Sequence, residues 1–466
     1  MKKYALVLVL LLLPGLVYAE DRLEFSGYVK NETALRENDN NTSLDKFKNI
    51  IELSSQYKIR DDELVFFGKV KYWYDAVYND DWREKFDAGH DQMAHIQRTQ
   101  WLRDCYIDYT NGPWFLRLGK QQVAWGQSDG VTILDRVNPV DLTEYFLPDF
   151  VDLRIPLWMA NINYSPKLNS NLQILIIPDF EQSEGAPDAA PFAFRAVKLF
   201  ERYKQRKRAT VPASVPNTDI SYPGKQFDNS TFGLQWQDRI GDLEYTLNYL
   251  NGYYYSARTY LTGGQSISTV AGDVWYLRKF TRWKMYGSSM NKTFTNPGPL
   301  QGITLRGDFA YYDDEPTYYG NVNTGITYGV KRWDNIFWLM GLDRYVFTKW
   351  SASFQYGQYI MQHKEAGSNP PNNFVMNAYT YGPQDRVENI FTLKISSHFL
   401  NDRILPEVLW STTDDRQGRL APKVNFELKD NLWLTLGANY FYGNEFDTNG
   451  QFRDQSEIYT NLKYTF

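Results

Sequence analysis

The sequence of 466 residues contains few of the residues that build disulfide frameworks and metal centres. Cys105 is the single cysteine, so the chain has neither an internal disulfide nor a CxxC zinc motif. Four histidines leave little material for a histidine-rich metal site. Acidic residues outnumber basic ones, 55 to 50, whereas a nucleic-acid partner requires a clustered basic surface. We therefore expect no cofactor, no metal and no nucleic-acid partner.

Long apolar runs are also scarce. Residues 4–13 form a short apolar run that follows Lys2 and Lys3 and precedes the small-residue site Val17-Tyr18-Ala19. This pattern is typical of a secretory signal, so we expect residues 1–19 to be removed after Sec-dependent export. Beyond residue 19 no run approaches the roughly 18 apolar residues of a membrane-spanning helix. Two classes remain, a secreted soluble protein and an outer-membrane β-barrel.

Aromatic residues are abundant, at 17%, although the mean hydropathy is only −0.52. Apolar and polar residues alternate with period two in many segments. In residues 243–249, for example, Leu247 and Tyr249 share one face while Thr246 and Asn248 share the other. Such alternation predicts β-strands. Because so many strands carry charges on the polar face, a lipid-facing exterior around a wet lumen fits better than a soluble sandwich.

Eighteen such segments occur. They are residues 23–36, 46–59, 64–78, 97–109, 114–124, 156–164, 172–179, 230–237, 243–253, 279–295, 302–312, 333–346, 350–362, 387–397, 403–411, 419–428, 432–441 and 456–466. Short and long connections mostly alternate between them, as in bacterial barrels with short periplasmic turns and long extracellular loops. We predict an all-β fold, a single transmembrane antiparallel barrel over residues 20–466 with about 18 strands, 16 being the alternative.

The last strand ends in Phe466, which shares a face with Leu462 and Tyr464. This ending resembles the C-terminal signal by which barrel-assembly machinery recognises its clients. We therefore expect that machinery as a partner and the Gram-negative outer membrane, with its lipid and lipopolysaccharide, as the location.

The stretch 116–156 differs from the rest, because a strand is followed by a long connection rich in Asp, Arg and Pro. Its pieces Gly119-Lys120-Gln121, Trp125-Gly126, Asn138-Pro139 and Asp152-Leu153-Arg154 resemble a family of outer-membrane barrels filed under a domain of unknown function and related in architecture to alginate-export porins. The resemblance implies a barrel that moves a hydrophobic or carbohydrate substrate. The basic lumen of alginate-export porins is not evident in this chain.

The connection 125–155 is a candidate pore constriction, since its prolines exclude it from the sheet and its charges are of both signs. The candidate residues are Asp135, Arg136, Asp141 and Arg154. The alternative is an extracellular loop held by its own salt bridges. Alternation assigns further charges to the lumen, namely Lys69, Lys71, Asp104, Asp108, Arg117, Arg306 and Asp308. Positive and negative charges are nearly balanced there, which predicts no strong preference for ions of one sign.

Within the long connection 180–229, residues 192–208 show helical spacing with a basic face. Such a helix could contact lipopolysaccharide phosphates or cover the pore mouth; equally, it could be a solvated loop helix without a partner.

The pattern as a whole favours an outer-membrane channel for small or extended solutes. A rival is a structural barrel that sheathes a periplasmic or cytochrome partner. A surface enzyme is the weakest alternative, because the sequence contains no GxSxG, HExxH or P-loop motif. We expect no enzymatic activity.

Overall fold

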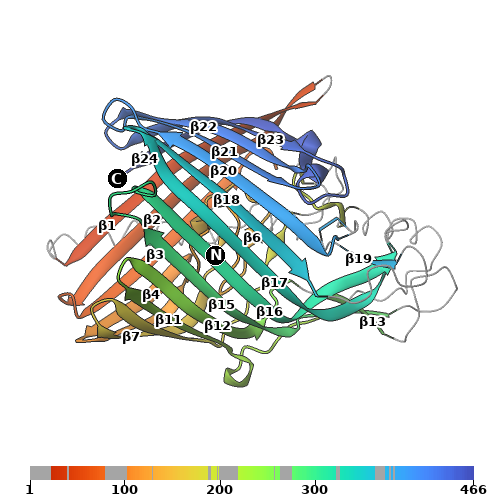
Figure 1. The fold of residues 1–466 in the computed structure, drawn as a ribbon, viewed down its shortest axis with the longest axis horizontal. Helices are drawn as coiled ribbons and strands as arrows, with labels where there is room; N and C mark the ends of the chain where they lie inside the picture. Colours follow the sequence, from red (N-terminus) through yellow and green to blue (C-terminus); the bar gives the residue numbers. More distant parts are fainter. Residues whose placement is uncertain are drawn as a thin grey trace, which may run out of the picture.

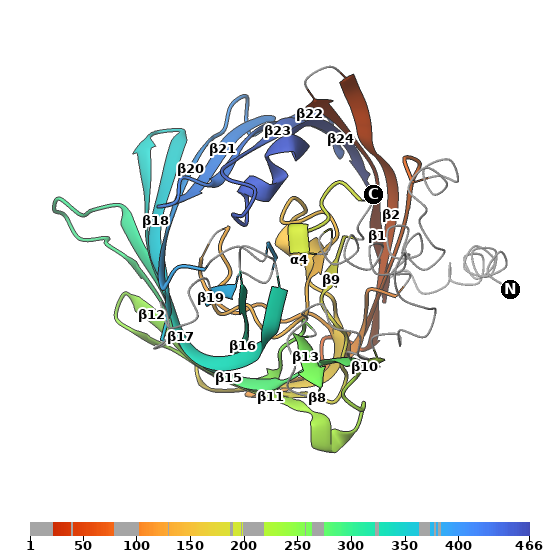
Figure 2. The same ribbon diagram turned by 90° about the vertical axis from the view of Figure 1, so that its right-hand side faces the viewer.

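The computed structural model describes residues 22–38, 41–78, 102–128, 130–186, 190–196, 198, 219–256, 258–262, 275–321, 326–362, 373–376, 379–380 and 384–466. Long antiparallel strands run obliquely around a closed ring (Figure 1). Viewed from its end, the ring encloses a lumen that contains further chain segments (Figure 2). Among the described residues, no helix is long and apolar enough to cross a membrane.

Each strand of the ring pairs with its neighbours in the sequence. The strands are β1 (Leu23–Asn38), β2 (Asn41–Arg60), β3 (Leu64–Asp75), β4 (Asp104–Asn111), β5 (Trp114–Gln121), β7 (Leu157–Lys167), β8 (Ser170–Ile177), β11 (Thr231–Ile240), β12 (Leu243–Tyr253), β15 (Arg282–Thr293), β16 (Ile303–Asn321), β17 (Ile326–Phe347), β18 (Trp350–Met361), β20 (Val387–Ser397), β21 (Ile404–Thr413), β22 (Gly418–Lys429), β23 (Leu432–Tyr442) and β24 (Glu457–Thr465). Among the described residues the sheet has nineteen strands. One of them, β19 (Asn373–Met376), pairs with β16, and the other eighteen form the ring.

The ring closes where the first strand pairs with the last. Lys30 lies opposite Lys463 in the β1–β24 ladder, and the backbone N–H groups of Gly27 and Phe466 each donate to the other residue's carbonyl at 2.9 Å. Closure gives every strand a partner on both sides, as backbone groups in lipid require. The predicted eighteen-stranded antiparallel barrel is confirmed.

Side chains alternate between the two faces of the ring as the sequence predicts. Leu247 is 54% exposed on the outer face, whereas its neighbour Asn248 is 5% exposed on the inner one. Leu462, Tyr464 and Phe466 are likewise exposed on the outside of β24. The exterior is therefore apolar and aromatic, and the buried polar and charged residues of the strands gather on the interior.

The predicted connection 313–332 is wrong, because most of it continues the two strands it was expected to join. β16 and β17 remain paired from Tyr312 to Asn321 across a bulge at Asp313 and Asp314. The bulge sets Asp313 and Asp314 opposite the single residue Asp334, so β16 accommodates one extra residue and pairing resumes at Glu315. The predicted strand 97–109 begins later, at Asp104, and residues 97–101 lie outside the described part.

Short elements occupy the connections. β6 (Asp141–Leu142) pairs with β9 (Glu184–Gly185), and α4 (Phe150–Leu153) is a single helical turn. β10 (Asp219–Ser221), β13 (Arg258–Thr262) and β14 (Trp275–Lys279) form a separate sheet. The 3-10 turns η2 (Phe227–Asn229) and η3 (Gly450–Gln455) complete the described elements. α4 and β9 lie inside the ring (Figure 2), which places parts of two long connections in the lumen.

Candidate functional site

The connection from β5 to β7, residues 122–156, lies inside the ring; we call it the lumen segment. Its apolar side chains pack on one wall. Ile133, Leu134 and Val137 are fully buried in a cluster with inward-facing residues of six strands, including Leu157, Leu175, Leu250, Met285, Tyr312 and Leu339. Burying an aliphatic side chain contributes about 1.5–3 kcal/mol. The lumen segment is therefore held against the arc from β7 to β17.

Hydrogen bonds fix the start of the lumen segment on the same wall. The carboxylate of Asp308 accepts the backbone N–H groups of Gln127 and Ser128 at 2.9–3.0 Å. Arg306 donates to the Gln127 carbonyl at 2.5 Å and pairs with Asp343. These inward charges, which the sequence assigned to the lumen, bind the lumen segment.

A second set of contacts holds α4 near β3 and β4. Arg103 is buried and donates to the carbonyls of Val151, Asp152 and Arg154 at 2.5, 3.0 and 2.8 Å. Lys71 forms an ion pair with Asp152. Burial raises the pKa of Asp152, but the charges of Lys71 and Arg103 outweigh burial and keep that pKa below its usual value. Asp152 is therefore an anion at neutral pH.

Glu144 makes the third attachment. Its carboxylate pairs with Lys46 and, at 2.7 Å, with Lys48, both on the inner face of β2. Burial raises the pKa of Glu144, yet the two ammonium groups dominate and hold it well below its ordinary value. The lumen segment thus touches the wall on two sides, through apolar packing on one and through ion pairs on the other.

The four candidate constriction residues all belong to the lumen segment. Asp135 and Arg154 form an ion pair with each other at 2.6 Å. The guanidinium of Arg136 lies 5.7 Å from the ring centre of Tyr312 on the wall. Asp141 accepts hydrogen bonds from the backbone and hydroxyl of Thr143, at 3.0 and 2.7 Å. Their role in a constriction remains a prediction.

The remaining predicted lumen charges also face inward. Lys69 lies 3.8 Å from both Glu52 and Asp104, and Arg117 forms a two-point contact with Asp108 at 2.7 and 2.8 Å. Together with Lys71, Arg306 and Asp308, all seven predicted lumen-lining residues are on the inner face. Most make ion pairs with neighbouring wall residues or with the lumen segment.

A polar cavity of about 490 Å³, which we call the passage, lies between the lumen segment and the wall formed by β1, β2 and β21–β24. It is lined by Lys30, Glu32, Thr33, Ala34, Lys46, Glu144, Leu147, Pro148, Asp149, Asp152, Leu405, Lys423, Asn425, Trp433, Thr435, Asn439, Glu457, Tyr459, Asn461, Lys463 and Thr465. None of the four candidate constriction residues is in this lining. Alternation could have identified Lys30 and Glu32, but nothing in the sequence distinguishes Glu144 and Asp149 from the other acids of the connection.

At the end of the barrel that carries the long connections, aromatic side chains from distant parts of the sequence pack together. Phe192 and Phe194 join Tyr145, Phe441 and Phe452 in a buried cluster. Arg195 donates to the Thr380 carbonyl at 2.7 Å and lies over the Phe446 ring. The predicted basic helix 192–208 lies largely outside the described residues, which include only 192–196 and 198 of it.

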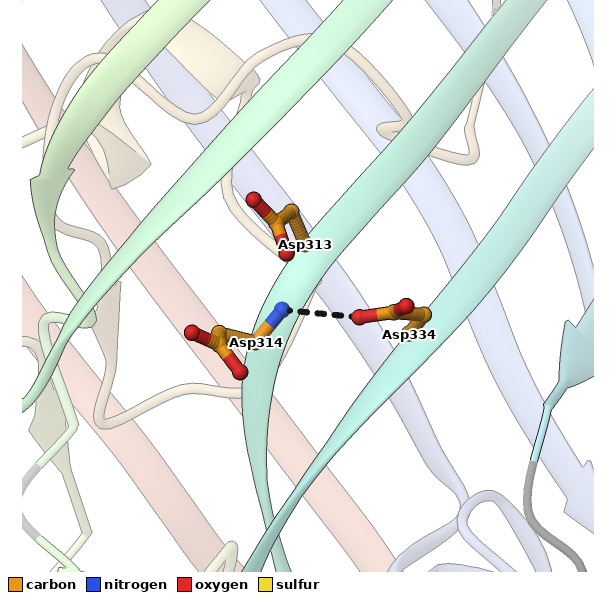
Figure 3. Close-up of side chains that lie close together, drawn as sticks. All are labelled: Asp313, Asp314 and Asp334. Atoms are coloured by element: carbon orange, nitrogen blue, oxygen red, sulfur yellow. Dashed lines mark hydrogen bonds between the residues drawn. The ribbon is translucent and has the colours of Figure 1, made fainter.

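Three carboxylates converge on the outer surface of β16 and β17, those of Asp313, Asp314 and Asp334 (Figure 3). Each already has a protein partner. Lys284 is 2.9 Å from Asp313, Arg332 is 3.4 Å from Asp314, and the Tyr311 hydroxyl donates to Asp334 at 2.8 Å. Two cations and one hydroxyl thus contact the three carboxylates, and we assign no metal to the cluster.

Comparisons with known proteins agree with this architecture. The profile of a family described as "Protein of unknown function (DUF1302)" matches residues 19–466. No curated protein matches the sequence. Among solved structures, Acinetobacter baumannii OccAB1 is similar with a TM-score of 0.52 and 9% identity, over 96% of this chain and 95% of that one. Pseudomonas aeruginosa OccK11 (OpdR) has a TM-score of 0.50 and 9% identity, over 95% and 96%. At such low identity the likeness concerns the fold alone.

Proposed function

Because the chain belongs to the family described as Protein of unknown function (DUF1302) and folds as an outer-membrane barrel, we propose that it is a porin-like channel of a Gram-negative outer membrane. Solutes cross through the passage between the lumen segment and the wall formed by β1, β2 and β21–β24. The lumen segment acts as the constriction, and the Asp135–Arg154 ion pair maintains its shape.

The asymmetry of the lumen is the observation that carries this proposal. Apolar packing closes the side of β7 to β17, whereas the opposite side keeps a cavity lined by lysines, acids, amides and hydroxyls. A water-filled barrel needs such a polar lining, and a dry core would not. A solute path on the polar side follows from this difference.

The sheath alternative is less compatible with this lumen. A folded cytochrome would need the space that Ile133, Leu134 and Trp125 occupy in contact with the wall. Displacing them would expose apolar surface on both the lumen segment and the barrel. A soluble partner at one end of the barrel remains compatible with the proposal.

The membrane arrangement is part of the same proposal. The short turns face the periplasm and the long connections face outside, where lipopolysaccharide is a partner. Residues 1–19 direct Sec-dependent export, and the outward Leu462, Tyr464 and Phe466 engage the barrel-assembly machinery. The near balance of lumen charges argues against a polyanion such as alginate as the solute.

Cysteine accessibility in planar bilayers tests the path. In a Cys105→Ser background, we expect a charged thiosulfonate reagent to reduce single-channel conductance of Asn461→Cys, whose side chain lines the passage. Thr460→Cys is the matched control, because the neighbouring residue faces outward. Ala310→Cys lies beneath the lumen segment at 0% exposure and should not react. Absence of conductance in every variant contradicts a channel, and block of Ala310→Cys without block of Asn461→Cys contradicts this path.

A further inference from the structure

The two faces of the passage differ in charge. The wall contributes four lysines, Lys30, Lys46, Lys423 and Lys463, and two glutamates, Glu32 and Glu457. The lumen segment contributes three acids, Glu144, Asp149 and Asp152, and no basic residue. A net positive wall therefore faces a net negative lumen segment across the same cavity.

Many of these charges already have partners. Lys30 pairs with Glu32 at 2.5 Å, Lys423 pairs with Glu407 at 3.2 Å, and Lys46 pairs with Glu144. In the described part of the chain, neither Lys463 nor Asp149 forms an ion pair. One cation on the wall and one anion on the lumen segment are thus available to a passing solute.

The surroundings of Lys463 strengthen the attraction between its charge and a passing solute. Its ammonium lies 4.3 Å from the ring centre of Tyr28, and Lys30 and Trp433 are its ladder partners on the two adjacent strands. The rings form a low-dielectric surface that reduces the screening of these charges.

We propose that this passage preferentially conducts dipolar solutes, those that carry one cationic and one anionic group. The inference rests on the proposed channel function. A solute of this class can direct its carboxylate toward Lys463 and its ammonium toward Asp149, and so gains attraction from both faces. An ion of one charge is attracted by one face and repelled by the other. An uncharged solute gains little from either.

Weak attraction suits conduction, because a solute must bind well enough to enter and loosely enough to leave. The paired charges fix the two faces in place without competing for the solute. Lys463 and Asp149 therefore act as specificity-determining residues, and the remaining ion pairs act as their support.

Swelling of liposomes that contain the purified protein tests the inference. The probes are glutamine, a zwitterion, and arabinose, an uncharged sugar of nearly equal size, with stachyose as a large reference solute. We expect glutamine to enter severalfold faster than arabinose. The double variant Asp149→Asn/Lys463→Gln should lose this difference, because glutamine entry slows to the rate of arabinose entry. The matched control Lys429→Gln/Asp430→Asn changes the same charges at the exposed end of β22 and in the turn that follows it, and should retain the difference.

The outcomes separate this inference from the channel function. Equal entry of glutamine and arabinose in the native protein, or a preference that persists in the double variant, overturns the inference and leaves the channel intact. Swelling no faster than in protein-free liposomes, for both probes, rejects the channel itself. Loss of the preference in the exposed-turn control would also overturn the assignment to Asp149 and Lys463.

Discussion

Gly287 decides how closely the lumen segment approaches the barrel wall. A Cβ atom at this position would meet Leu134 Cδ2 at 2.2 Å and the Phe309 carbonyl oxygen at 3.0 Å. Glycine therefore leaves a notch in the inner face of β15 that the Leu134 side chain fills. The notch explains why an aliphatic residue of a loop can be fully buried against a strand.

We predict that Gly287→Ala destabilises the protein by about 1–3 kcal/mol, the usual cost of overpacking. Leu134→Ala should cost about 2–5 kcal/mol, because it leaves a cavity. In the double variant the clash is absent. Its loss in free energy of unfolding should therefore be smaller than the sum of the losses in the two single variants. Urea unfolding of the refolded protein, followed by tryptophan fluorescence, measures all three. Additive free energies would show that the two side chains do not meet.

At the scale of elements, a single turn of helix depends on its surroundings. α4 has four residues and its N-cap Asp149 makes no side-chain capping bond. A helix this short is unstable alone. Arg103 supplies donors to three carbonyls at its C-terminal end, and Lys71 pairs with Asp152. The position of α4 in the lumen is thus set by β3 and by the residue before β4.

The Lys71–Asp152 ion pair makes this position sensitive to acid. The pKa of Asp152 is lowered from its ordinary 3.8, so its ionised form stabilises the docked state. That stabilisation, about 1.5–3 kcal/mol for a charged hydrogen bond, is complete above the ordinary pKa. It is lost as the pH falls through the lowered value.

We therefore predict steady single-channel conductance from pH 7 to about 4 and more frequent conductance fluctuations below. Asp152→Asn should fluctuate at all pH values, whereas Asp149→Asn, which removes an unpaired neighbour, should keep the native pH response. An Asp152→Asn channel as quiet as the native one at neutral pH would show that this ion pair does not hold α4.

At the scale of the whole molecule, the ring depends on one seam between the ends of the chain. Phe466 closes it with two backbone hydrogen bonds to Gly27, while the residue is 49% exposed on the outside. A Cβ at Gly27 would meet Phe466 Cζ at 2.9 Å, so the glycine gives this ring room.

Deletion of Phe466 should reduce the yield of assembled, heat-modifiable barrel severalfold, because both the seam bonds and the outward ring are removed. Phe466→Ala keeps the backbone bonds and isolates the contribution of the ring. Thr465→Ala, on the inner face, is the control and should assemble normally. Normal assembly after the deletion would show that the terminal residue is dispensable.

The sequence by itself determined the barrel. Alternation in a strand directly reports which side chains meet lipid and which meet water, because successive residues point to opposite faces. Residues 243–253 were predicted with the bounds of β12, and Asn248, Asp308 and Arg117 lie on the inner face of the ring. The ring forms because each strand pairs with the next strand in the sequence. The seam between the first and the last strand is the additional long-range pairing that closes it.

Only the tertiary structure decided how the lumen is divided. The lumen segment has no periodicity, so Asp135, Arg136, Asp141 and Arg154 could not be separated from Glu144, Asp149 and Asp152 by position in the sequence. Which acids line the passage depends on contacts with residues far away in the chain, such as the notch at Gly287 and the ammonium groups of Lys46 and Lys71. Local patterns cannot encode such contacts, because each one joins a loop to a strand that is its neighbour only after the ring has closed.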